Sequence, residues 1–69
     1  MAATRIIVWN REMDDDARVD VWRVIGKRGY GYDAFGPNGG WLETVTGYDN
    51  YESAALDALR AIERARHAA

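Results

Sequence analysis

Few side chains in this sequence could carry out catalysis. There is no cysteine, and His67 is the only histidine. A nucleophilic mechanism needs a hydroxyl or thiol beside a base, but His67 stands near the end of the sequence, where we expect fraying. Paired carboxylates could serve a glycosidase, but no pair is marked by its spacing. We therefore expect no enzymatic activity, and we expect His67 to be an ordinary surface residue.

Metal and cofactor sites are also not expected. A zinc site would need a second histidine or a cysteine cluster. Asp14, Asp16 and Arg18 begin like a calcium-binding loop. However, arginine stands at the third ligand position, and Val19 occupies the place where such a loop requires glycine.

The glycines of the segment 26–31 raise the possibility of phosphate or RNA binding. Their spacing differs from that of a dinucleotide-binding loop. The segment Gly26–Gly29 matches the G-x-x-G of KH domains, but strand-like sequence flanks it, whereas helices flank the motif in that family. We interpret it as a hairpin turn. A nucleic-acid-binding alternative would combine this basic turn with a stacking platform and would use Arg23, Lys27, Arg28, Tyr30 and Tyr32.

The charge distribution favours a different kind of partner. Eleven acidic and nine basic residues give a net charge of −2, with a pI near 5.2, which argues against direct nucleic-acid binding. Between Gly29 and Leu59 there is no lysine or arginine, and the stretch contains five acidic residues. The carboxylates either solvate a small domain or form an acidic surface for a basic partner. The candidate partner-binding residues are Asp14, Asp15, Asp16, Asp33, Glu43, Asp49 and Glu52.

Capping separates these candidates into two groups. Asp49 and Glu52 have the spacing of a capping box, so helix formation alone explains them. The loop acids and the two strand acids, Asp33 and Glu43, are the better candidates. We expect charge reversal at Asp33 or Glu43 to weaken binding more than reversal at Asp57.

The elements that must position these residues follow from local patterns. Runs of β-branched and aromatic residues predict strands at about 4–9, 18–25, 30–35 and 41–46. The turn Gly36–Gly40 carries proline and Asn-Gly. From residue 50 to about 66 the apolar period becomes helical, with Ala55, Leu56, Leu59 and Ile62 on or beside one stripe. We predict an α+β fold in one domain, 1–69: an antiparallel meander of three or four strands with one C-terminal helix packed on one face.

The open face of that sheet is expected to carry aromatic side chains. Three tryptophans, four tyrosines and one phenylalanine exceed what one covered face can bury. No window is apolar enough for a membrane helix, and no signal peptide is recognisable, so we expect a cytoplasmic protein without membrane contact.

Two resemblances add to this interpretation. The segment from Trp22 to Ala65 resembles the short three-strand-plus-helix repeats of a bacterial family of unknown function, through the Asn38-Gly39 turn, Gly47-Tyr48 and Glu52-Ser53-Ala54. The small, cysteine-free, acidic chain as a whole resembles phage-encoded anti-CRISPR inhibitors. This resemblance implies a stoichiometric inhibitor that occupies a DNA-binding surface of a CRISPR effector.

The sequence therefore predicts a non-enzymatic, phage-derived, protein-binding inhibitor that blocks a basic nucleic-acid-binding site by DNA mimicry. The first alternative is a small nucleic-acid-binding module that uses the basic, aromatic hairpin. The second is a structural or oligomerising module whose open sheet face pairs with itself, so both a monomer and a homodimer remain open.

Overall fold

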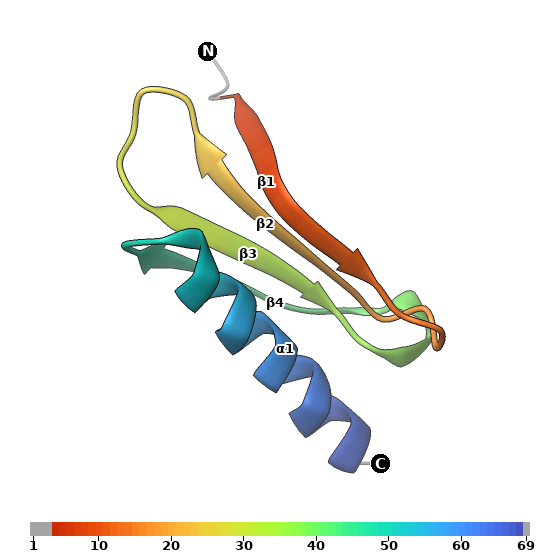
Figure 1. The fold of residues 1–69 in the computed structure, drawn as a ribbon. Helices are drawn as coiled ribbons and strands as arrows, with labels where there is room; N and C mark the ends of the chain where they lie inside the picture. The colour runs from red at the N-terminus through yellow and green to blue at the C-terminus, as the bar shows by residue number, and fades with distance from the viewer. Residues whose placement is uncertain (1–3, 69) are drawn as a thin grey trace.

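The computed structural model describes residues 4–68 and contains a four-stranded antiparallel sheet with one helix. The strands are β1 (Arg5–Glu12), β2 (Arg18–Val24), β3 (Tyr30–Phe35) and β4 (Trp41–Tyr48), and each pairs with its neighbour in sequence. A 3₁₀ turn, η1 (Pro37–Gly39), precedes β4, and α1 (Tyr51–His67) follows it. The helix crosses one face of the sheet (Figure 1). The predicted α+β meander with a C-terminal helix is confirmed.

Two strands are longer than predicted. β1 continues through Asn10, Arg11 and Glu12, and β4 continues to Tyr48. The extra β1 residues are polar, but all three pair with β2 and are exposed. Polar residues suit this position because an edge strand that lies beyond the helix is solvated on both faces. Hydrophobic content alone therefore underestimates this strand.

The core lies between the helix and β2–β3. Val19, Val21, Tyr32 and Ala34 contribute from the sheet, and all are at most 2% exposed. The helix presents mainly small side chains to them: Ala54, Ala55, Ala58, Ala61 and Ile62. Because alanine is short, the helix backbone can approach the sheet closely, and the large ring of Tyr32 fills the space between them.

The N-cap of the helix lies one residue later than predicted. Asn50, not Asp49, is the N-cap, and its side-chain oxygen accepts a 2.8 Å hydrogen bond from the Ser53 N–H. Leu56 was predicted to lie beside the apolar stripe, but it is 50% exposed. The alanines at 54, 58 and 61 take the central contacts, and the rotation that buries them turns Leu56 toward solvent.

On the opposite face, Trp22 is protected without help from the helix. A Cβ at Gly31 would lie 2.8 Å from Cη2 and Cζ2 of Trp22, so the indole lies directly over the bare glycine backbone. The Arg5 guanidinium stacks 3.9 Å from the centre of the indole ring on this open face. As a result Trp22 is only 7% exposed although it lies on the open face.

This packing predicts that residue 31 must be glycine. In Gly31→Ala the new methyl would overlap Trp22, so we expect a loss of roughly 1–3 kcal/mol in the free energy of unfolding. Gly40→Ala is the matched control, because Gly40 has φ −72° and no atom within 4 Å of a built Cβ. Urea denaturation measures both variants. Equal stabilities would contradict the packing described here.

Candidate protein-binding surface

The loop between β1 and β2 is a tight turn. The N–H of Met13 donates to the Ala17 carbonyl at 2.9 Å, and the N–H of Asp16 donates to the Met13 carbonyl at 3.1 Å. Asp16 has φ 70°, a left-handed conformation that aspartate tolerates better than most residues. The N–H of Asn38 donates to the Asp15 carbonyl at 2.9 Å. This bond joins the loop to η1, so both turns form one end of the molecule.

Arg66 fixes this loop to the end of the helix. Its Nε and Nη2 lie 2.9 and 3.2 Å from the two carboxylate oxygens of Asp15, a two-point contact. Its Nη1 also donates to Glu63 at 2.7 Å. The hydrogen bonds from Arg66 lower the pKa of Asp15, and those same bonds raise the pKa of Arg66. Both carboxylate oxygens of Asp15 are therefore engaged by Arg66, and this contact joins the loop to the helix.

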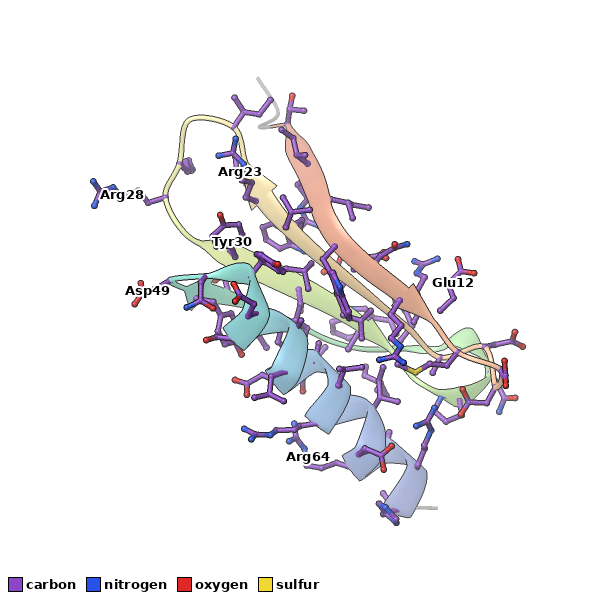
Figure 2. All side chains as sticks on the ribbon, viewed as in Figure 1. Glu12, Arg23, Arg28, Tyr30, Asp49 and Arg64 are labelled. Atoms are coloured by element: carbon purple, nitrogen blue, oxygen red, sulfur yellow. The ribbon has the colours of Figure 1, made fainter. Side chains whose placement is uncertain are left out.

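The neighbouring carboxylates remain available. Glu12, Asp14 and Asp16 are exposed and make no ion pair within residues 4–68. We call these three residues the acidic loop end. The sequence groups Glu12 with the acids of the first loop, although it was not selected as a candidate binding residue; in the structure it ends β1 beside that loop. Figure 2 shows Glu12 at one end of the sheet, with Arg28 and Asp49 at the other.

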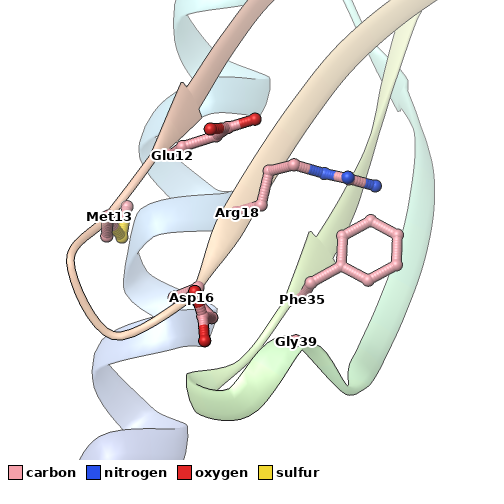
Figure 3. A pocket seen from close by; sticks show the side chains of 7 residues that line it. Glu12, Met13, Asp16, Arg18, Phe35 and Gly39 are labelled. Carbon is pink, nitrogen blue, oxygen red and sulfur yellow. The ribbon is translucent and has the colours of Figure 1, made fainter.

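A row of side chains runs from the acidic loop end across the open face. The strand register places Glu12, Arg18, Phe35 and Trp41 opposite one another in turn. The Arg18 guanidinium lies 4.3 Å from the centre of the Phe35 ring. Glu12, Arg18 and Phe35 border a hollow of about 310 Å³ that reaches Gly39 (Figure 3). Trp41, at the far end of the row, is 63% exposed.

Asp33 is at the centre of the open face, but it is already paired. Its carboxylate lies 3.2 Å from Nη1 of Arg5 and accepts a 2.7 Å hydrogen bond from the Thr44 hydroxyl. Directly opposite it on β2 stands Asp20, which lies 3.3 Å from Arg18. Asp20 was not predicted as a site residue, although its alternation with Val19 and Val21 places it on the face opposite to theirs, which it shares with Asp33. Two arginines thus neutralise two adjacent carboxylates.

Glu43 lies on the opposite side of the sheet. It is half-buried on the helix-covered face and accepts a hydrogen bond from the Tyr32 hydroxyl. A second such contact joins Tyr48 to Asp57 of the helix at 2.8 Å. Burial raises the pKa of both tyrosines, and their carboxylate partners raise it further. The interpretation of Glu43 as an open-surface acid is wrong, because the register turns it toward the helix.

The remaining acidic candidates are distant from the loop. Asp49 and Glu52 are exposed at the start of the helix. Figure 2 shows Asp49 at the end of the sheet opposite Glu12. The structure therefore groups Asp14, Asp15 and Asp16. It places Asp33, Glu43, Asp49 and Glu52 elsewhere.

The basic alternative loses its stacking platform. Tyr32 is 2% exposed beneath the helix, so the prediction of an accessible ring there is wrong. Tyr30 is half-buried, and its ring meets that of Tyr51 edge-on at 6.5 Å. Lys27 and Arg28 remain exposed in the β2–β3 turn. They border a pocket of about 300 Å³ with Trp22 and Tyr30, while Arg23 is half-buried nearby in β2.

Among residues 4–68, no three histidine, aspartate or glutamate side chains come together as metal ligands. The helix in the described part of the chain is not long and apolar enough to cross a membrane. Comparisons of the chain with protein-family models, with curated proteins and with solved structures found no match.

The lowered pKa of Asp15 predicts an acid-sensitive contact. The stabilisation is present above the ordinary aspartate pKa of about 3.9 and is lost as the pH falls through the lower pKa of the folded state. Asp15→Asn should therefore destabilise the protein at neutral pH and flatten the loss of stability in acid. Urea denaturation from neutral to strongly acidic pH measures both effects.

The control is Asp49→Asn, which alters an exposed carboxylate without an ion pair in the described chain and should keep the wild-type acid profile. An Asp15→Asn profile parallel to that of the wild type would contradict the role of this contact.

Proposed function

We propose that the protein is a non-enzymatic inhibitor that binds a basic, nucleic-acid-binding protein through its acidic loop end. One observation supports this proposal above the others. Glu12, Asp14 and Asp16 are exposed carboxylates without ion pairs in the described chain. Asp14 and Asp16 lie on the loop that the Asp15–Arg66 contact joins to the helix, and Glu12 ends β1 beside it. Carboxylates at fixed positions compete for cationic sites that otherwise bind phosphates.

Fixing the loop matters for affinity. A mobile loop must lose conformational freedom when it binds, and that loss opposes association. The Asp15–Arg66 contact and the Asn38–Asp15 bond impose this order before any partner arrives. Asp15 thus contributes as a positioning residue, while its neighbours carry the available charge.

Trp41 supplies an aromatic anchor for the same surface. It lies at the opposite end of the row that begins with Glu12, three strand spacings or about 14 Å across the sheet. Exposed tryptophans frequently dominate binding energy at protein interfaces. A partner with a basic groove beside an apolar pocket fits this combination. The resemblance to anti-CRISPR inhibitors suggests a CRISPR effector subunit as such a partner.

A second candidate function is single-stranded nucleic-acid binding at the β2–β3 turn. It is favoured by one observation: Lys27 and Arg28 border the pocket of about 300 Å³ that Tyr30 also lines. This site lies at the end of the sheet opposite the acidic loop end (Figure 2).

The proposed function predicts a charge-dependent capture. The tagged protein should retain a basic protein from the source cell at low salt and release it at high salt, because exposed charges are screened. Asp14→Lys/Asp16→Asn, in which asparagine tolerates the left-handed backbone at residue 16, should reduce capture on the order of tenfold or more, whereas Asp49→Lys, at the opposite end, should not. Pull-down with mass spectrometry measures this. Capture that is independent of salt, or equally sensitive to Asp49→Lys, would refute the proposal.

The two functions can be separated with a labelled oligonucleotide. Under the proposed function, a fluorescence-anisotropy titration of single-stranded DNA or RNA at low salt should show no binding at tens of micromolar protein. Binding that disappears in Lys27→Glu/Arg28→Glu would instead support the nucleic-acid candidate. Asp33→Lys is unsuitable for either comparison, because it breaks the contact with Arg5 and perturbs the sheet.

A further inference from the structure

The strand β1 forms one edge of the sheet, and its outer side is unpaired in the described chain. The sheet order ends at β1, and the helix packs mainly over β2, β3 and β4, so β1 lies beyond it (Figure 1). Seven of its eight residues are exposed. Among them, Ile6, Ile7 and Val8 are 38%, 58% and 39% exposed, the densest group of exposed aliphatic side chains on the molecule's described surface.

Such an edge invites pairing with another strand. Unpaired backbone N–H and C=O groups can accept a further strand. Natural proteins block this with charged side chains or a β-bulge, and often with a lysine or proline in the edge strand. β1 contains neither residue. Its charges instead stand mainly at its ends, with Arg5 at the start and Arg11 and Glu12 at the finish.

A β-bulge at Val8 places the two end charges on one face. Ile7 pairs with Trp22 and Trp9 pairs with Val21, which leaves Val8 as the extra residue. In a regular strand, residues seven apart point to opposite faces. Here Arg5 lies opposite Val24 and Glu12 opposite Arg18, two residues on the same face of β2. The bulge therefore places Arg5 and Glu12 in one row about a two-fold axis, while the Arg5 guanidinium keeps its contacts with Trp22 and Asp33 of its own copy.

We propose that β1 pairs antiparallel with β1 of a second copy, about a two-fold axis through the bulge. In this register Arg5 lies in the same row as Glu12 of the second copy, Ile6 opposite Arg11, and Ile7 opposite Asn10. A parallel arrangement would instead place Arg5 beside Arg5 and Glu12 beside Glu12. The antiparallel dimer is favoured because it avoids these like-charge neighbours.

The resulting dimer is a continuous eight-stranded sheet with both helices on the same face. Two copies related by the axis carry the same bulge and the same local twist, so the edge strands match in shape. The contact covers Ile6, Ile7 and Val8. The axis also closes the assembly, because each copy uses the same edge and leaves β4 at both outer ends.

The interface can be tested by sedimentation equilibrium over a range of protein concentrations. The wild type should be a dimer, and Ile7→Lys should raise its dissociation constant on the order of tenfold or more. Ile25→Lys is the matched control, because Ile25 is 56% exposed and lies in the turn after β2. Circular dichroism establishes that each variant is folded. A wild type that stays monomeric, a dimer weakened equally by Ile25→Lys, or an open-ended polymer would overturn the proposal.

Cysteine cross-linking tests the register, since the chain has no cysteine of its own. When Ile7→Cys and Asn10→Cys proteins are mixed under oxidising conditions, the proposed register predicts a disulfide between the two species. Self-cross-linking of Ile7→Cys alone, or no cross-linking in a folded mixture, would overturn this register. The dimer-disrupting variant Ile7→Lys keeps Asp14 and Asp16 intact, so loss of the dimer is distinguishable from loss of the proposed partner binding.

Discussion

The burial of Tyr32 between the sheet and the helix determines the arrangement of the other side chains. Its ring fills the space that small helix residues leave, and its hydroxyl donates to Glu43 beneath the helix. Once Tyr32 faces the helix, the two-residue alternation of β3 turns Asp33 to the opposite side. Cross-strand pairing extends this choice to β2, where Val21 faces inward and Trp22 outward. Which residues lie on the open face therefore follows from the packing of Tyr32 against the helix.

Much of the fold could be predicted from sequence, because strand, turn and helix patterns act over a few residues. The Gly36–Gly40 turn and the change of period after residue 50 are signals of this kind. Strand register is different, since it depends on which residues meet across the sheet. The bulge at Val8 has no local signature, and without the register neither Glu43 nor Tyr32 could be assigned to a face. The predicted N-cap was wrong by one residue. Asp49 and Asn50 are both good N-cap residues, and where β4 ends determines which of them caps the helix.

The candidate site was predictable only in part, for an electrostatic reason. A run of acids along the sequence suggested a continuous negative surface, but ion pairs join residues far apart in the chain. Asp33 meets Arg5, 28 positions earlier, and Asp15 meets Arg66, 51 positions later. These contacts remove two of the predicted carboxylates from the available set. Within the described residues, what remains unpaired at this end of the molecule is Asp14 and Asp16 of the loop together with Glu12, while Asp49 and Glu52 lie unpaired at the start of the helix.

The connection between Asp15 and Arg66 also has a consequence for the order of folding. Each strand pairs with its neighbour in sequence, so the sheet can assemble from hairpins whose short loops cost little entropy to close. The contact between the first loop and the last helical turn spans most of the chain and closes a far longer loop. Because that contact requires both the sheet and the docked helix, the carboxylates of the first loop acquire their fixed positions only in a fully folded chain.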